Sequence, residues 1–171
     1  MDGWTGGRRP GSVCRVCSIG MDESTLRLAG PDDTDAIADV YLALFRATYA
    51  FPLAHTGDQV RAWIRDVVVP ASETWVGVSP DGLIVAVMAL TADQVDKLYV
   101  APGWTGRGIG GRLLDLVKAM RSHGLDLYTF QVNAGARRFY ERHGFVAVTF
   151  GDGSGNEEGE PDVRYAWQPT A

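Results

Sequence analysis

Apolar positions recur along this chain with two different spacings, and together they predict a mixture of helices and strands. Between positions 33 and 49 they fall three or four residues apart, which is the spacing of one helix face. Residues 75–78 and 83–90 are apolar runs on either side of Ser79-Pro80-Asp81-Gly82, a turn signal, and they predict a hairpin. The predicted strands are 25–29, 75–78, 83–90, 95–100, 125–131, 146–150 and 163–167.

Residues that cap or stop helices divide the rest of the chain into four predicted helices. These begin at Asp32 or Asp33, at Thr56 or Asp58, at Gly108, and at Asn133 or Ala134. They end at Tyr49, near Pro70, at His123 with Gly124 as the cap, and at His143. On the third helix, the positions expected to be buried are Leu113, Leu114, Leu116, Val117 and Met120.

Length and composition are typical of one acidic globular domain. The chain has 171 residues, which is enough for a substantial hydrophobic core, and its formal net charge is −5. Such a charge argues against general nucleic-acid binding, which needs a basic face. No apolar run approaches the ~20 residues of a membrane span. We therefore expect neither nucleic acid nor membrane as a partner.

Residues 1–20 differ from the rest of the chain because they are rich in glycine, arginine and serine. They lack the apolar segment of a secretory signal, so we expect a disordered leader or a misassigned start, with one domain over 21–171. Cys14 and Cys17 form a lone CxxC, a pattern found in redox pairs and zinc sites. Since no second CxxC or histidine pair accompanies it, we interpret the thiols as incidental and predict no metal site. The absence of other cysteines is typical of a cytoplasmic protein.

The most informative segment lies between the strand at 95–100 and the helix at 108. Pro102 is followed there by a turn that contains Gly106, Gly108 and Gly111. Glycines allow a tight turn whose N–H groups point inward, and the start of the helix adds unpaired N–H groups and a partial positive charge. The combination predicts a binding site for phosphate oxygens.

Three kinds of ligand compete for this turn. A P-loop requires Gly-Lys-Ser/Thr at its end, whereas Gly111 is followed by Arg112 and Leu113. A dinucleotide-binding fold needs a second parallel strand that ends in an acidic residue, but the strand at 125–131 runs into Val132 and Asn133. The third ligand is an acyl-CoA, and it is favoured by a second motif further along the chain.

Two motifs together carry a family resemblance. Val100-x-Pro102 followed by Gly106-Arg107-Gly108-Ile109-Gly110, and then Asn133-x-x-Ala136-Arg137-Arg138-Phe139-Tyr140-Glu141-x-x-Gly144-Phe145, resemble the GNAT superfamily of acyl-CoA N-acyltransferases. The resemblance covers about 93–148 strongly, and the predicted order of strands and helices agrees with it. It implies an α/β (α+β) fold whose mixed, mostly antiparallel central sheet has about seven strands with helices on both faces. It also implies that the strands 95–100 and 125–131 splay apart around the pantetheine arm.

The same resemblance implies an activity and a cofactor site. The expected reaction moves an acetyl group from acetyl-CoA to a primary amine of a small molecule or peptide, by direct attack in a ternary complex. The absence of cysteine in the folded region agrees with a mechanism that forms no covalent enzyme intermediate. Dimers are common in the family, so a homodimer is compatible with the resemblance. The expected acetyl-CoA-binding residues are Leu98, Tyr99, Val100, Thr105, Gly106, Arg107, Gly108, Ile109, Gly110, Gly111, Asn133 and Arg138.

Tyr140 matches the family's tyrosine and is our expected general acid, because a phenol near the sulfur can protonate the departing thiolate. The general base is less defined. Family members often carry a carboxylate where Gln94 stands, and Asp96, two residues on, would face the same side of a regular strand. We choose Asp96 as the base, with Asp93 and His55 as alternatives.

Two departures from the family pattern motivate an alternative function, against which the retained Tyr140 and Asn133 argue. Thr105 stands where the family usually has glutamine or arginine, and Gln94 cannot act as a base. The alternative is a catalytically degenerate domain that binds acyl-CoA as a sensor or interaction module. The glycine-rich, acidic loop at 151–161 is either a solvated turn or a means of attracting a cationic amine. The sequence does not choose among amino acids, polyamines, aminoglycosides and protein amines as acceptors.

Overall fold

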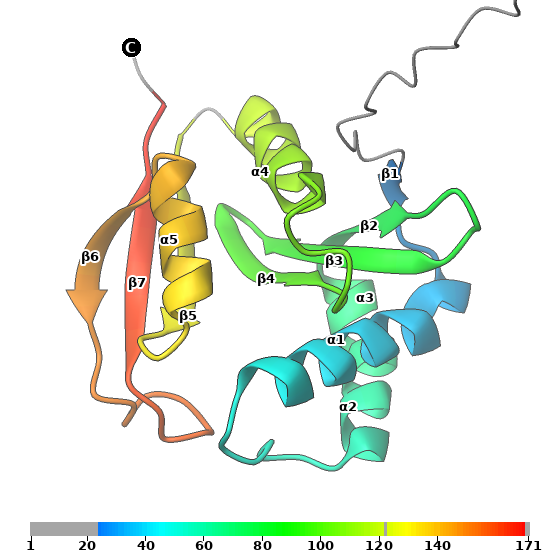
Figure 1. Cartoon of the computed structure of the whole chain (residues 1–171), viewed down its shortest axis with the longest axis horizontal. Helices are drawn as coiled ribbons and strands as arrows, with labels where there is room; N and C mark the ends of the chain where they lie inside the picture. The colour runs from blue at the N-terminus through cyan, green and yellow to red at the C-terminus, as the bar shows by residue number, and fades with distance from the viewer. Residues whose placement is uncertain (1–23, 122, 170–171) are drawn as a thin grey trace, which may run out of the picture.

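The computed structural model describes residues 24–121 and 123–169, which form one seven-stranded sheet with the order β1-β2-β3-β4-β5-β7-β6 (Figure 1). Neighbouring strands are antiparallel except for the parallel pair β4 and β5. The predicted mixed, mostly antiparallel sheet is therefore confirmed. The strands are β1 (Thr25–Leu28), β2 (Glu73–Val78), β3 (Ile84–Thr91), β4 (Gln94–Val100), β5 (Leu125–Phe130), β6 (Val146–Phe150) and β7 (Asp162–Trp167).

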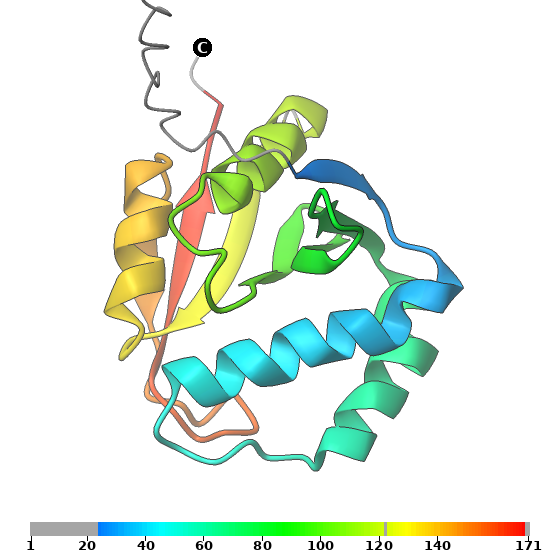
Figure 2. The same cartoon turned by 45° about the vertical axis from the view of Figure 1, so that its right-hand side comes forward.

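Helices cover both faces of the sheet, as the turned view shows (Figure 2). On one face lie α1 (Thr34–Thr48) and α2 (Gly57–Trp63), and on the other lie α4 (Ile109–Met120) and α5 (Ala134–Arg142). Short helical segments extend α1 and α2: η1 (Pro31–Asp33), the π-helical turn η2 (Ile64–Val68) and α3 (Val69–Ala71). In the described part of the chain, no helix is long and apolar enough to cross a membrane.

Two hydrophobic clusters hold the helices against the sheet. In one, Leu113, Leu114 and Val117 of α4 are completely buried against β3, β4, β5 and β7. In the other, Ile37 and the rest of the inner face of α1 pack with α2 and η2 on β2 and β3. Because both faces of β3 are covered, its interior is an unbroken buried run. Each fully buried leucine contributes roughly 1.5–3 kcal/mol to folding.

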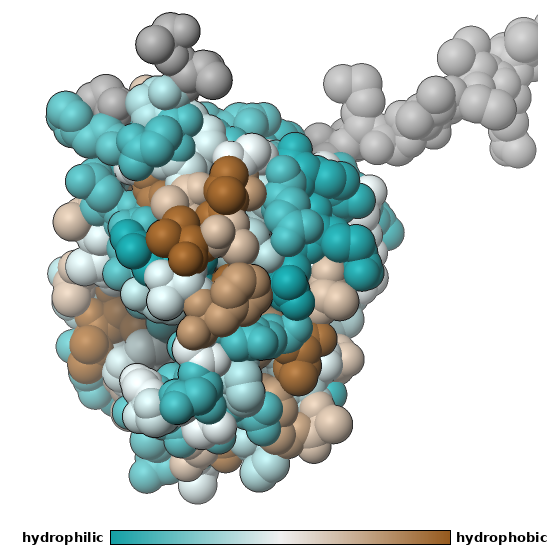
Figure 3. Space-filling view, turned by 90° about the vertical axis from the view of Figure 1, so that its left-hand side faces the viewer, coloured by the Kyte–Doolittle hydropathy of each residue, from teal (hydrophilic) through white to brown (hydrophobic). Residues whose placement is uncertain are grey.

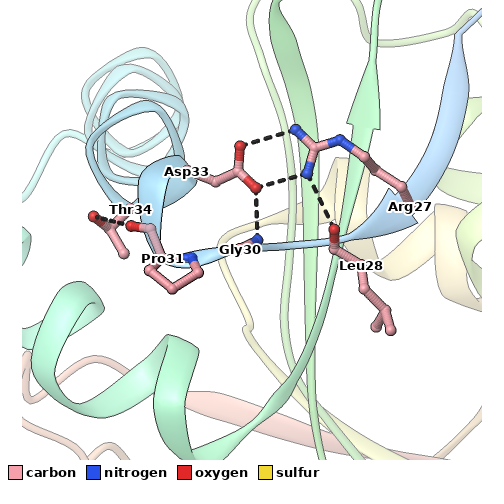
Figure 4. A network of polar contacts seen from close by, with 6 residues as sticks. All are labelled: Arg27, Leu28, Gly30, Pro31, Asp33 and Thr34. Atoms are coloured by element: carbon pink, nitrogen blue, oxygen red, sulfur yellow. Dashed lines mark hydrogen bonds and ion pairs between the residues drawn. The ribbon is translucent and has the colours of Figure 1, made fainter.

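A network of polar contacts anchors the start of α1 to β1 (Figure 4). The Arg27 guanidinium donates to both carboxylate oxygens of Asp33, at 2.6 and 2.9 Å, and the Gly30 amide donates to the same carboxylate at 2.7 Å. These donors lower the pKa of Asp33, with the Arg27 hydrogen bond as the main cause. Asp33 therefore joins the helix start to the first strand, but its side chain does not cap α1 itself.

The structure tests the predicted bounds of the second and third helices. The Thr56 side chain caps α2 as expected, and the helix continues through the π-helical turn η2, with Trp63 at the end of α2 and Val67 within η2 both exposed. Pro70 lies inside α3, and the helical segment ends one residue later, at Ala71, near Pro70 as predicted. On the third predicted helix, α4 ends at Met120, which is exposed, and Gly124 lies beyond that end and does not cap it.

β6 lies at the edge of the sheet, on the left-hand side of the molecule in Figure 1. Its apolar side chains Val146, Val148 and Phe150 are exposed. In the space-filling view of this side, hydrophobic residues lie among hydrophilic ones (Figure 3). The predicted leader at 1–20, with Cys14 and Cys17, lies outside the described residues.

Candidate active site

The sheet opens between β4 and β5. These strands pair only at Gln94 with Asp126 and at Val95 with Leu127, although β4 continues to Val100. Over residues 98–100, β4 is paired with β3 on its other side. In the described part of the chain, alternate peptide groups of β4 beyond Val95 therefore have no strand partner toward β5 and can bind an extended ligand. The predicted splaying of these two strands is confirmed.

A β-bulge lies in β4 just before this opening. On β3, Leu90 and Ala89 are adjacent, but their partners on β4 are Val95 and Lys97, so Asp96 is the extra residue. A bulge interrupts the alternation of side chains along a strand. The regular alternation on which the sequence argument for Asp96 relied is therefore interrupted, but Gln94 and Asp96 do line the same cavity.

The opening leads into a cavity of about 830 Å³ between α1, β4, β5, α5 and the loop 151–161. Its walls contain an unusual number of aromatic side chains, which come from segments far apart in the sequence. The aromatic residues lining it are Tyr41, Phe45, Tyr49, Tyr99, Tyr128, Phe130 and Tyr140. The acidic residues lining it are Asp96, Asp152, Glu158 and Asp162, and the basic ones are Lys97 and Arg164.

Tyr140 of α5 lines the cavity although it is only 7% exposed. Its ring packs against Phe145 and Tyr165, at centroid distances of 5.9 and 6.1 Å. Among the described residues, its hydroxyl makes no hydrogen bond. Burial raises the pKa of this phenol well above its ordinary value of 10, so it stays protonated at neutral pH. The site thus contains a buried donor that is available to a ligand.

Asn133 is the N-cap of α5, as the sequence predicted. Its side-chain oxygen accepts from the Ala136 amide at 2.9 Å and so caps α5. Its amide nitrogen donates to the Tyr49 hydroxyl at 2.8 Å, across the opening between α5 and the end of α1. Asn133 lines the cavity, but both polar atoms of its side chain already have protein partners.

Of the three candidate bases, only Asp96 lines the cavity. Its carboxylate pairs with the neighbouring Lys97 ammonium at 2.9 Å. Asp93 is exposed, and its carboxylate lies 3.9 Å from the Arg121 guanidinium. His55 pairs with Glu157 at 2.7 Å, which links the loop after α1 to the loop 151–161. The geometry therefore favours Asp96 over Asp93 and His55.

The glycine turn lies outside the residues that line this cavity. Gly106 and Gly108 have φ angles of 78° and 92°, which other residues rarely adopt. Gly108 precedes the first turn of α4 and supplies no side-chain cap, so the first N–H groups of that helix are available to phosphate oxygens. Thr105 and Arg107 in this turn are exposed.

The arginines near this turn have different environments. The Arg107 guanidinium lies over the Trp104 ring, at 4.5 Å from its centroid. Arg112 donates to the Ser24 carbonyl at 2.8 Å, and Arg137 contacts Tyr165 and Gln131. Arg138 is exposed, without a side-chain hydrogen bond or ion pair in the described part of the chain. Arg107 and Arg138 therefore suit a phosphate better than Arg112 or Arg137.

Helix α4 approaches α5 closely just after the glycine turn. A Cβ atom at Gly110 would lie 3.1 Å from the Phe139 ring, the residue before Tyr140. A small residue at this position therefore lets α4 and the helix that carries Tyr140 pack directly together. Gly110 and Ile109, both buried, contribute backbone and packing to the site.

The sequence reasoning missed the aromatic wall of the cavity. Tyr41 of α1 is only partly buried, and its ring contacts the Tyr99 ring at a centroid distance of 5.0 Å. Burial raises the pKa of Tyr41 to about 12 and that of Tyr99 well above 10. Helical spacing alone does not separate an aromatic residue in a core from one at a cavity wall.

Comparison with known proteins agrees with this architecture. Residues 70–147 match the family model for the acetyltransferase (GNAT) domain. The mycothiol acetyltransferase of Beutenbergia cavernae is 32% identical over a segment that covers 67% of this chain and 43% of that protein. The chain thus spans less than half the length of this curated relative.

Solved structures share the fold. Apo YjaB from Escherichia coli superposes with a TM-score of 0.71 at 20% identity, over 86% of this chain and 99% of that chain. YncA from Salmonella typhimurium, solved with its cofactor acetyl-CoA, has a TM-score of 0.63 at 20% identity, over 86% of this chain and 95% of that chain. Residues 70–147 thus match the GNAT acetyltransferase family, as the two motifs indicated, and the described chain shares the fold of these structures.

Proposed function

We propose that this protein transfers an acetyl group from acetyl-CoA to a primary amine by direct attack within a ternary complex. The observation that carries the proposal is the buried Tyr140, which lines the cavity where β4 and β5 diverge and whose hydroxyl has no hydrogen-bond partner among the described residues. Because this hydroxyl is not among the fully buried atoms and belongs to a residue that lines the cavity, it is accessible to a ligand there and can donate to it.

The cofactor is assigned to the free side of β4 and to the glycine turn. In this proposal, peptide groups of Leu98, Tyr99 and Val100 bind the pantetheine amides. The pyrophosphate lies on the N–H groups from Thr105 to Gly111, with Arg107 and Arg138 near the phosphates. The positive φ angles at Gly106 and Gly108 and the uncapped start of α4 support this assignment. Asn133 would contribute through the helix start that it caps.

Each proposed catalytic group has one task. The amine nitrogen attacks the thioester carbonyl carbon, the C–S bond breaks, and the products are an amide and CoA. Tyr140 donates a hydrogen bond and then its proton to the departing sulfur. Asp96, directly or through a water, accepts the proton that the amine loses. Because burial raises the pKa of Tyr140, the phenol remains protonated and available in the resting enzyme.

The direct test is Tyr140→Phe, which removes one oxygen and keeps the ring. We expect kcat to fall about 10²–10⁴-fold, the usual range for a lost general acid, while the Kd for acetyl-CoA is unchanged. CoA release with a panel of amines measures kcat, and calorimetric titration measures Kd. An unchanged kcat would remove Tyr140 from the mechanism.

The same measurements decide the alternative of a binding module. If acetyl-CoA binds and no amine in the panel releases CoA above the hydrolysis background, the degenerate sensor becomes the better description. If NAD, the control ligand, binds and acetyl-CoA does not, the assignment of the glycine turn is wrong. In that case the proposed activity is wrong as well.

A further inference from the structure

The cavity carries an excess of negative charge. Of its six charged side chains, four are carboxylates, and both cations already have partners: Lys97 pairs with Asp96 at 2.9 Å, and Arg164 pairs with Asp126 at 3.0 Å. Three carboxylates, two in the loop 151–161 and one at the start of β7, therefore remain without a cationic partner among the described residues. They are Asp152, Glu158 and Asp162.

Glu158 is the most available of the three. Asp152 accepts hydrogen bonds from the amide and hydroxyl of Ser154, and Asp162 accepts one from Asn156 at 3.3 Å. Within the described residues, the carboxylate of Glu158 has no hydrogen bond or ion pair. An incompletely exposed carboxylate at the wall of a cavity is stabilised by a cationic ligand.

Aromatic side chains lie across the cavity from this carboxylate. Burial is the main cause of the raised pKa of Tyr41 and of Tyr49, and the charge of Glu158 adds to it in both. Glu158 lines the same cavity as these two phenols, of which Tyr41 lies on α1 and Tyr49 just after its end. A carboxylate facing aromatic rings suits an organic cation, which gains from the charge and from the ring faces.

The cavity thus has two polar regions, here called its two poles, that differ in what they bind. One is Tyr140, deeply buried on α5, with an unpartnered hydroxyl. The other is the acidic loop, whose Glu158 lines the same cavity as Tyr41 and Tyr49. A reacting amine must be neutral to attack a thioester, whereas a carboxylate prefers a charged ammonium. A single amino group therefore cannot satisfy both poles at once.

We propose that the acceptor is a dicationic alkylamine whose distal ammonium binds Glu158 and Asp152 while its other amine reacts near Tyr140. This inference rests on the proposed function and specifies its substrate class. Glu158 is then a specificity-determining residue, because it recognises the end of the acceptor that does not react. A monoamine would be attracted to the acidic loop by its only nitrogen and would be held there in the charged form.

Three probes with the same five-carbon chain test the proposal with the full-length protein: cadaverine, pentylamine and aminovalerate. They place an ammonium, a methyl group and a carboxylate, respectively, at the distal end. We expect kcat/KM for cadaverine to exceed that for pentylamine by about tenfold or more, as a charge-assisted contact allows, and aminovalerate to be the poorest substrate. Equal kcat/KM for cadaverine and pentylamine would overturn the proposal.

Glu158→Gln assigns the effect to one residue. It should lower kcat/KM for cadaverine about tenfold and change that for pentylamine less than about twofold. The matched control is Glu160→Gln, because Glu160 belongs to the same loop but does not line the cavity. If Glu160→Gln lowers cadaverine turnover as much as Glu158→Gln does, the loop acts only through its general charge, and the specific site is wrong.

Failure of this inference is distinct from failure of the proposed function. Acetyl-CoA binding together with CoA release by any amine supports an acetyltransferase, whichever of the three probes is preferred. An enzyme that prefers pentylamine or aminovalerate would retain the proposed function and lose the dicationic acceptor. An enzyme that binds no CoA would lose both.

Discussion

The glycine turn before α4 and the cavity beside α1 differ in what supplies their chemistry. The turn offers mainly backbone N–H groups, held by glycines with positive φ over one short stretch of sequence. The cavity offers side chains from α1, β4, β5, α5 and the loop 151–161, which only the fold brings together. A ligand feature common to many enzymes, such as a pyrophosphate, can be bound by backbone alone. A particular acceptor requires particular side chains, so we expect the cavity to determine specificity.

A substitution at Asp96 should give the largest difference between the two regions, because it should lower kcat without changing acetyl-CoA binding. Asp96→Asn removes the proposed base and should lower kcat about 10²-fold, with no change in the Kd for acetyl-CoA. Steady-state kinetics and calorimetric titration measure the two quantities. Because Asp96 also pairs with Lys97, Lys97→Gln is the control that breaks the pair and keeps the carboxylate. If both variants lose activity equally, Asp96 serves the ion pair and not proton transfer.

An intermediate effect should come from the glycine turn. Gly108→Ala places a Cβ atom at a φ of 92°, which costs roughly 1–2 kcal/mol, and the turn must shift to relieve it. We expect about a tenfold increase in the Kd for acetyl-CoA, while KM for the amine at saturating acetyl-CoA is nearly unchanged.

Gly82→Ala is the matched control for that prediction. Gly82 has a similar φ of 82° and open space around it, and it lies in the hairpin turn between β2 and β3. It should lower Tm about as much as Gly108→Ala does and leave acetyl-CoA binding intact. If the two variants weaken binding equally, the effect belongs to global stability and not to the turn.

The smallest expected effect concerns the anchor of α1, the helix that carries Tyr41 in the cavity wall. The hydrogen bond from Arg27 lowers the pKa of Asp33, so the charged carboxylate stabilises the fold at pH values above its unfolded pKa of about 3.8. That contribution is lost as the pH falls through the lower, folded pKa. Because the pair is partly exposed, Asp33→Asn should cost about 0.5–1 kcal/mol near neutral pH.

Urea unfolding of wild type and Asp33→Asn at neutral pH and at about pH 2 measures this contribution. The difference in unfolding free energy should disappear at the acidic end. A difference that persists there would mean that the carboxylate charge is not its cause. The acetyl-CoA Kd should be the same in both proteins, because the glycine turn lies on another part of the fold.

Local patterns were enough to predict most of the fold. Apolar spacing and turn residues located all seven strands and the four main helices, and Asn133 and Thr56 cap helices where the sequence indicated. These features depend on interactions within a few residues, so they can be read from the chain directly. The prediction failed at Met120, where α4 ends earlier than expected and the side chain is exposed.

The sequence by itself determined the family, the glycine turn and the position of Tyr140 on a helix that follows a strand. Tertiary structure alone decided that β4 carries a bulge at Asp96, and that Asn133 contacts Tyr49 across the opening. It also decided that Glu158 lies opposite the tyrosines of α1 in one cavity. The physical reason is range: backbone turns and helix caps depend on neighbouring residues, whereas a cavity depends on how segments more than 100 residues apart pack together, as the contact between His55 and Glu157 illustrates at a separation of 102.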